Sequence, residues 1–252
     1  MFDKIAKHYD LIMSPFDYRE LVDCLDDLIV SCGGIRTDVL SLGCGTSEEL
    51  VYFMQLGYRI SGIDLSPAMI EISKEKLKTG DFRRGDIRKF RTGKKYDNII
   101  CVFDTVNYLT EMKDLSNCFA SVNKALNAGG LFLFDFNSVY GMIHEWDGVR
   151  IEETDDFFIS YDSKFDLNSM ILKCRMKFFV KEKSGKFDSF EETHYERGYT
   201  PEEMRDVLKK NGFKLLKLLP FLSRRQTRSS ELDRYQIAAQ KIKESTINKM
   251  NF

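Results

Sequence analysis

The chain has 252 residues, of which 43% are hydrophobic and 31% are charged, a composition typical of a globular protein that buries a core of useful size. Its formal net charge of −1 provides no overall positive field, which excludes nonspecific attraction to nucleic acid or to an anionic membrane. The six cysteines form no C-x-x-C pair, so no metal site is implied, and no run reaches the roughly 20 apolar residues that span a bilayer. We therefore expect a cytoplasmic protein, monomeric or homodimeric, with neither a membrane nor a nucleic acid as partner.

Helical and strand patterns alternate along the first half of the chain. Apolar residues recur at helical spacing over residues 17–31, and the glycines that follow end this helix. Further helices are expected over residues 47–56, over 66–77 with Ser66 as its N-cap, and over 111–127. The runs between them predict strands or strand-and-turn segments over residues 38–42, 58–63, 81–87, 96–104 and 131–137. Strands that alternate with helices indicate a parallel sheet covered on both faces.

The pattern then changes. Residues 149–198 alternate between polar and apolar side chains without helical signals, and "KSGK" at residues 183–186 is typical of a hairpin turn. We interpret this segment as an antiparallel β insertion. It divides a larger domain into residues 1–148 and 199–252, and the second part resumes with a helix capped by Thr200 and two closing strands.

A turn with two glycines follows the first expected strand, in "VLSLGCGTSEEL". Ligands of such sheets bind beyond the carboxyl ends of the strands, and a glycine at position 45 lets a ligand approach the backbone. A dinucleotide fingerprint would need a third glycine at position 48, where Glu48 stands, followed by Glu49. Two carboxylates at a helix start repel a phosphate, which disfavours a nicotinamide cofactor.

Asp64 points to the kind of ligand. It ends the second expected strand, 19 residues after Gly45, where a carboxylate can bind both hydroxyls of a ribose. The ligand therefore has a ribose but no phosphate beside the glycines, and a positive charge would suit the two glutamates. S-adenosylmethionine meets this description, because it carries an adenine, a ribose, a sulfonium and an amino-acid end.

With these residues in place, the sequence resembles the core of the class I S-adenosylmethionine-dependent methyltransferases over residues 35–138. The resemblance is carried by "VLSLGCGTSEEL", "ISGIDLSPAMIEISKEKL", "GDIRKF", "YDNIICVFDTVNYL" and "LNAGGLFLFDFNS". The runs "IAKHYDLIMSPFDY" and "FEETHYERGYTPEEMRDVLKKNGF" are similar to a small-molecule subgroup with a β-rich insertion, which includes bacterial amino-sugar N-methyltransferases.

The resemblance implies an α/β fold, with a doubly wound, mostly parallel, Rossmann-like sheet of seven strands and the antiparallel insertion as a lid over the substrate. It implies in-line transfer of a methyl group from S-adenosylmethionine to a nitrogen or oxygen of a small-molecule acceptor. It also assigns cofactor contacts to Tyr9, Tyr18, Gly43, Cys44, Gly45, Asp64, Leu65, Met69, Asp86, Ile87 and Phe103.

Four residues are expected to meet the acceptor. Asn107 and Tyr108 follow the fourth expected strand, and the resemblance implies that they face the methyl group of the cofactor. In the insertion, His194, Glu196 and Gly198 share one face of a strand, and Arg197 lies on the other. We expect His194 to accept a proton from the acceptor and Arg197 to bind an acceptor carboxylate or phosphate.

Two positions depart from the family pattern. Ser41 stands where the family usually has an acidic residue, and Ser47 where it often has a third glycine. The missing acid removes a partner of the cofactor's ammonium group, so either the affinity is lower or Glu48 or Glu49 compensates. A protein that binds S-adenosylmethionine without catalysis, as a regulator or partner, is the alternative function.

Overall fold

The computed structural model describes residues 2–182, 184–227 and 231–242. Seven strands form one sheet in the order β10-β11-β5-β4-β1-β2-β3. Neighbouring strands from β5 to β3 are parallel, whereas β11 runs antiparallel to both β5 and β10. The bounds are β1 (Asp38–Leu42), β2 (Arg59–Asp64), β3 (Asp81–Arg84), β4 (Tyr96–Cys101), β5 (Leu126–Asn137), β10 (Phe213–Pro220) and β11 (Arg234–Lys241). The expected doubly wound, mostly parallel sheet is confirmed.

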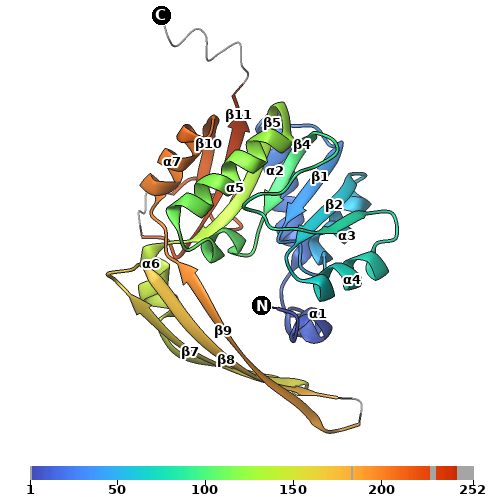
Figure 1. Cartoon of the computed structure of the whole chain (residues 1–252), viewed down its shortest axis with the longest axis vertical. Coiled ribbons are helices and arrows are strands. Elements are labelled where there is room, and N and C mark those ends of the chain that lie inside the picture. The colour runs from blue at the N-terminus through green and yellow to red at the C-terminus, as the bar shows by residue number, and fades with distance from the viewer. Residues whose placement is uncertain (1, 183, 228–230, 243–252) are drawn as a thin grey trace, which may run out of the picture.

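Helices cover both faces of this sheet (Figure 1). The buried residues of α5 (Met112–Ala125) and α7 (Pro201–Lys210) belong to one core cluster. Most buried apolar residues of α2 (Tyr18–Ser31), those of α3 (Glu48–Gln55) and Ile70 of α4 (Pro67–Lys76) belong to the cluster on the other face. Ser66 and Thr200 cap their helices as expected, each accepting a hydrogen bond from a backbone N–H of the first turn. Among the described residues, none of the helices has the length and apolar character to cross a membrane.

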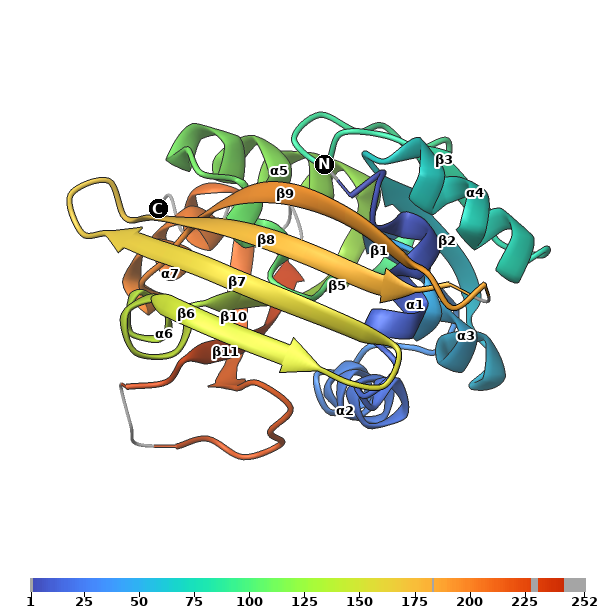
Figure 2. The ribbon, with the colours of Figure 1, turned by 90° about the horizontal axis from the view of Figure 1, so that it is seen from below.

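A second sheet of four antiparallel strands follows β5. It consists of β6 (Gly148–Glu153), β7 (Phe157–Asp166), β8 (Ile171–Lys181) and β9 (Phe187–Arg197), paired in that order. Figures 1 and 2 show it lying across one end of the larger sheet, with the N-terminal segment beside it. Lys183, in the expected hairpin turn, lies outside the described residues.

The N-terminal segment packs between the second sheet and the larger domain. It contains η1 (Ala6–His8) and α1 (Tyr9–Ile12). Its apolar residues share a core cluster with Met69 of α4 and with the inward side chains of β7 and β8: Ile5, Ala6, Ile12, Phe157, Ile159, Phe178 and Val180. The short remaining helices are η2 (Thr105–Tyr108), α6 (Val139–Gly141) and η3 (Met142–Trp146).

Two boundaries differ from the expectation. The helix expected over residues 111–127 ends at Ala125, because Leu126 already pairs with Tyr96 and the register of β4 against β5 shifts there. Gly129 has a φ of +83°, which a glycine adopts without strain in such an irregular strand. The fourth strand ends at Cys101 rather than at residue 104, because Phe103 and Asp104 both have positive φ angles.

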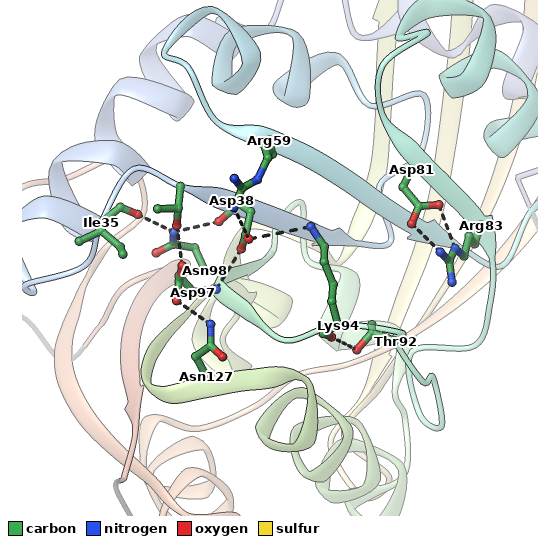
Figure 3. A network of polar contacts seen from close by, with 11 residues as sticks. Ile35, Asp38, Arg59, Asp81, Arg83, Thr92, Lys94, Asp97, Asn98 and Asn127 are labelled. Atoms are coloured by element: carbon green, nitrogen blue, oxygen red, sulfur yellow. Dashed lines mark hydrogen bonds and ion pairs between the residues drawn. The ribbon is translucent and has the colours of Figure 1, made fainter.

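Polar side chains hold the amino ends of β1, β2 and β4 together (Figure 3). The Asp38 carboxylate pairs with Arg59 across 3.2 Å and accepts the backbone N–H of Asp97 at 3.0 Å. The buried Asn98 amide donates to the carbonyl oxygens of Ile35 and Asp38, both at 2.9 Å. This network lies opposite the carboxyl ends of the strands, so it supports the sheet and leaves the other edge free for a ligand.

Replacing Asn98 with alanine is expected to lower the free energy of unfolding by about 1–3 kcal/mol, because one buried and one partly buried carbonyl oxygen lose their donor. Urea unfolding of the purified variant would measure this. Asn127→Ala is the matched control, since its exposed amide bonds to Asp97 at the surface, and we expect a change within about 0.5 kcal/mol. Equal losses in the two variants would contradict this role of Asn98.

Candidate active site

A cavity of about 540 Å³ lies over the carboxyl ends of β1, β2 and β4. We call it the cofactor cavity. All residues that the sequence predicted as cofactor contacts line it: Tyr9, Tyr18, Gly43, Cys44, Gly45, Asp64, Leu65, Met69, Asp86, Ile87 and Phe103. The chain thus brings together residues from its N-terminal segment and from the loops after four parallel strands, as expected for a ligand crevice in this type of sheet.

The glycine turn is fixed to β2 by its own backbone. The N–H groups of Gly43 and Cys44 donate to the carbonyl oxygen of Ile63 at 2.8 and 3.1 Å. Gly43 has a φ of +66°, and a Cβ there would lie 2.5 Å from the Thr105 side chain. Position 43 therefore requires glycine for both conformation and space.

Ser47, at the place of the family's third glycine, has a φ of +63°. Glycine adopts this left-handed conformation without strain, whereas a serine is strained there. The hydroxyl of Ser47 lies 2.8 Å from that of Ser73, which in turn donates to the carbonyl oxygen of Gly45 at 2.9 Å. These contacts connect the turn to α4 and hold the serine in place.

Asp64 is held with its carboxylate in the cofactor cavity. One oxygen accepts the backbone N–H of Gly45 at 2.9 Å, and the other accepts that of Ser66 at 2.8 Å. Burial raises the pKa of this carboxyl, while the backbone hydrogen bonds act against the rise. Each carboxylate oxygen has a second lone pair, so the group can accept two further hydrogen bonds from a ligand.

Asp86, on the same cavity wall, is already paired. Its carboxylate accepts from the guanidinium of Arg88, with the shortest contact at 2.7 Å, and this contact lowers the pKa of Asp86. Arg88 also donates to Asp114 at 2.9 Å. Asp86 is therefore ionised and oriented, with lone pairs left for a donor.

Glu49 occupies the place where an acid is missing from β1. The hydroxyl of Ser41 donates to the Glu49 carboxylate at 2.8 Å, and Glu49 lines the cavity although only 4% of it is exposed. Burial raises the pKa of Glu49 to about 7, while the Ser41 hydrogen bond and the charge of Lys76 lower it. Glu48 pairs with Lys76 at 2.7 Å instead. Of the two candidates for compensation, the geometry favours Glu49.

Aromatic rings close one side of the cavity. Phe16, Tyr18 and Phe103 contact one another, with ring centroids 5.0 to 5.4 Å apart. The N-terminal segment, which carries Phe16 and leads into Tyr18, is tied to the glycine turn, because the Thr46 hydroxyl donates to Asp10.

A second cavity of about 360 Å³, the acceptor cavity, lies between the larger sheet and the insertion sheet. Phe2, Asp104, Tyr108 and Trp146 line both cavities, so the two meet at these residues. The rest of the wall comes from η3 and the four insertion strands, and it includes His194 and Glu196 of β9.

A buried ion network fixes the junction of the two cavities. Arg234 of β11 contacts Asp135 at 2.5 Å and Asp104 at 3.3 Å. The backbone N–H of Asp104 donates to Asp135 at 2.8 Å, and the Asn137 amide donates to the Asp104 carboxylate at 3.1 Å. Phe103 and Asp104 keep positive φ angles of 56° and 50°, a strained pair of residues of the kind found at functional sites.

The comparisons with known proteins agree with this geometry. A family model described as "Methyltransferase domain" matches residues 39–130. The putative methyltransferase YqeM of Bacillus subtilis is 28% identical over 221 residues, which are 85% of this chain and 87% of that protein. A solved S-adenosylmethionine-dependent methyltransferase from Clostridium acetobutylicum has a TM-score of 0.84 and 25% sequence identity, over 96% of this chain and 99% of that one.

The chain contains a methyltransferase domain, and its relatives and structural neighbours support an S-adenosylmethionine-dependent methyltransferase. A further relative of this methyltransferase is the dTDP-3-amino-3,4,6-trideoxy-alpha-D-glucopyranose N,N-dimethyltransferase of Streptomyces venezuelae. It is 28% identical over 119 residues, which are 47% of this chain and 50% of that protein.

The four residues expected to meet the acceptor lie in different places in the methyltransferase. Tyr108 lines both cavities, and His194 lines the acceptor cavity. Asn107 and Arg197 line neither of them, contrary to the expectation. The Asn107 amide donates to the carbonyl oxygens of Asn137 and Arg197, and the Arg197 guanidinium pairs with Glu203 at 3.0 Å. Asn107 therefore holds the backbone around the site, whereas Arg197 connects β9 to the first turn of α7.

Both ring nitrogens of His194 are engaged. Nδ1 lies 2.9 Å from the Tyr108 hydroxyl, and Nε2 lies 2.9 Å from Glu192. Glu192 also accepts the backbone N–H of Phe2 at 3.2 Å. His194, only 3% exposed, thus orients Tyr108, and it could take a proton from an acceptor only by breaking one of these contacts.

Four further residues that line the cavities were not predicted from the sequence as site residues: Asp104, Trp146, Glu196 and Arg234. Two of them carried a signal. Asp104 directly follows Phe103 at the end of a strand, and Glu196 shares a strand face with His194. Trp146 and Arg234 carried none, because they reach the site from segments far away in the sequence.

Proposed function

We propose that the methyltransferase transfers the methyl group of S-adenosylmethionine to a nitrogen or oxygen atom of a small molecule bound in the acceptor cavity. The observation that carries the proposal is the meeting of the two cavities at Asp104 and Tyr108. A methyl group at this junction would have the cofactor on one side and the acceptor on the other. The sugar-nucleotide substrate named for the Streptomyces venezuelae relative supports an acceptor of small size.

The donors and acceptors of the cofactor cavity fit S-adenosylmethionine. Asp64 would accept the two ribose hydroxyls, and Asp86 would accept the adenine amino group, with the Ile87 backbone beside it. Leu65 and Met69 would pack on the adenine, and the narrow turn at Gly43 leaves backbone exposed to the amino-acid end.

Glu49 would bind the ammonium group of the cofactor. Its buried carboxylate is oriented by Ser41 of β1, and the neighbouring Glu48, which also lines the cavity, pairs with Lys76 instead. The cofactor's ammonium group beside Glu49 would also favour the ionised form of this carboxyl, whose pKa is raised to about 7 by burial.

Glu49→Gln is expected to weaken binding of S-adenosylhomocysteine about 10- to 100-fold at pH 8, because a hydrogen bond to a charged group contributes about 1.5–3 kcal/mol. The difference in affinity between the variant and the natural chain should become smaller as the pH falls below 7, since Glu49 of the natural chain then becomes protonated and loses its charge. Calorimetric titration at pH 6, 7 and 8 would measure both effects.

The control for this titration is the variant Glu71→Gln, because Glu71 is an exposed glutamate on α4. This variant should bind S-adenosylhomocysteine with the affinity of the natural chain. A pH-independent loss smaller than threefold in Glu49→Gln would contradict the proposed ammonium contact.

Methyl transfer needs alignment more than it needs protein nucleophiles. S-adenosylmethionine supplies a methyl group that its sulfonium already activates. The chain must hold the acceptor atom in line with that methyl, and such orientation supplies roughly 7–11 kcal/mol in favourable cases. The rings of Phe16, Tyr18 and Phe103 would exclude water from the reacting atoms, which suits a step that disperses positive charge.

Residues 149–198 would act as the substrate lid, with residues 1–148 and 199–252 as the cofactor-binding domain. This division is supported by the separate sheet that β6 to β9 form and by the position of the acceptor cavity beneath it. Acceptor specificity would then reside in the insertion strands and in η3.

The proposed function is tested in two steps with the purified chain. Calorimetry should first detect saturable binding of S-adenosylhomocysteine. Incubation with S-adenosyl-L-[methyl-³H]methionine and panels of small amines and alcohols should then give labelled product. Cofactor binding without transfer to any acceptor would favour a regulatory binder, and absence of binding would contradict the proposal.

A further inference from the structure

The junction of the two cavities carries more negative than positive charge. The carboxylates of Asp104, Asp135 and Glu196 face a single guanidinium, that of Arg234, which contacts both aspartates. Glu196 forms no ion pair with any described residue, and its side chain lines the acceptor cavity. A neutral acceptor would leave this excess uncompensated, whereas a cationic one would balance it.

Glu196 is also better placed than His194 to receive a proton. Both nitrogens of His194 already have partners, at 2.9 Å each. The Glu196 carboxylate lines the acceptor cavity and interacts with the Tyr108 hydroxyl and the Asn137 amide. A carboxylate accepts in such contacts and has further lone pairs, so it can take a proton without losing them. Tyr108 lines the cofactor cavity as well, so Glu196 lies next to the place where methyl transfer is proposed.

We propose that Glu196 takes the proton of the methyl acceptor and that, together with Asp104, it selects an amine over an alcohol. This inference rests on the proposed function of the two cavities. The acceptor enters as an ammonium ion that Glu196 and Asp104 attract.

The reaction then proceeds in two steps, a proton transfer and a methyl transfer. One N–H proton passes to the Glu196 carboxylate, which leaves a neutral amine with its lone pair. The lone pair attacks the methyl carbon, a C–N bond forms as the S–C bond breaks, and the electrons of the broken bond go to sulfur. The positive charge thereby moves from sulfur to the methylated nitrogen, and Glu196 later releases its proton to solvent.

The surroundings of Glu196 suit this task. Burial, and after it the charge of Asp104, raises the pKa of the Glu196 carboxyl, while Arg234, Tyr108 and Asn137 act in the opposite direction. A base with a raised pKa is closer to an amine in proton affinity. The other titratable groups that face Glu196 or line its cavity are His194 on the same strand, Cys174 on β8, Tyr161 on β7, and Glu145, Asp147 and Arg150.

The proposal is tested with Glu196→Gln, with Glu196→Asp as the conservative variant, and with Glu191→Gln as a control. Glu191 is an exposed glutamate on the same strand. Isotope-edited infrared spectroscopy of each S-adenosylhomocysteine complex would follow the carboxyl bands with pH. The band lost in Glu196→Gln should titrate above about pH 6, against an ordinary value near 4.3 for glutamate. Titration below about pH 5 would overturn the proposal, and this measurement needs no acceptor.

The kinetic test uses matched pairs of aminodeoxy sugar nucleotides and their hydroxyl counterparts as acceptors. We expect at least tenfold higher kcat/KM for the amine member of a pair. Glu196→Gln should lower kcat for it about 10²- to 10⁴-fold, with unchanged S-adenosylhomocysteine affinity, and should abolish the rise of kcat with pH. Glu196→Asp should recover part of the rate.

Two kinetic results would overturn the inference: a preference for the alcohols, or a kcat of Glu196→Gln within threefold of the natural chain. Failure of the natural chain to bind S-adenosylhomocysteine would instead contradict the proposed function. The two sets of results therefore distinguish a failure of the inference about Glu196 from a failure of the proposed function.

Discussion

Asp64→Asn is expected to weaken binding of S-adenosylhomocysteine by 100-fold or more. The carboxylate accepts the N–H of Gly45 with one oxygen and that of Ser66 with the other, so an amide NH₂ would face a backbone N–H at one of these places. The variant would also lose the charge-assisted hydrogen bonds to the ribose. Two such bonds contribute about 3–6 kcal/mol together, and each 1.4 kcal/mol is tenfold in affinity.

Calorimetric titration of the folded variant would measure this loss. Asp81→Asn is the control, because Asp81 is exposed at the start of β3 and pairs only with the exposed Arg83 in the described structure. A loss below tenfold in Asp64→Asn would show that the ribose does not depend on this carboxylate.

Arg234→Met is expected to lower the free energy of unfolding by about 3–5 kcal/mol at pH 8. Among the described residues, the substitution removes the only cation that forms an ion pair with the buried Asp135, and breaking such a pair leaves an uncompensated buried charge. It also frees Asp104, so the junction between the two cavities should lose its shape and methyl transfer should fall with stability.

The effect of Arg234→Met should depend on pH in a defined direction. Burial already raises the pKa of Asp135, and removal of the guanidinium would raise it further. A carboxyl with a pKa raised by folding binds its proton more tightly in the native state, so stability rises as the pH falls through that pKa. The loss should therefore be largest at pH 8 and smaller at pH 5.

Urea unfolding from pH 5 to 8 would check both statements. Arg225→Met, at an exposed position, should stay within about 0.5 kcal/mol of the natural chain. The double variant Arg234→Met, Asp135→Asn should recover part of the loss. A change below 1 kcal/mol in Arg234→Met at pH 8 would contradict the structural role of this network.

The parts that sequence predicted well depend on local patterns. Strand and helix periodicity, the caps Ser66 and Thr200, and the order of the glycine turn and Asp64 determine the large sheet and one edge of it. Residues that follow the carboxyl ends of neighbouring parallel strands necessarily meet at that edge, so the lining of the cofactor cavity could be predicted without knowing any side-chain contact.

The acceptor side could not be predicted in this way, because it depends on how the insertion sheet is placed. Alternation identifies the face that His194 and Glu196 share, but only the tertiary structure shows that His194 is held between Tyr108 and Glu192. The same holds for Glu49, which we propose takes the role of the acid that is missing at Ser41. Its choice over Glu48 depends on the distance between β1 and the first turn of α3, which the sequence does not give.

A crystal structure of the chain with S-adenosylhomocysteine tests the central claim most directly. We expect both ribose hydroxyls on Asp64, the ammonium group on Glu49, and the thioether sulfur directed toward the junction beside Tyr108 and Asp104. A ribose held by other residues, or a sulfur directed away from the acceptor cavity, would contradict it.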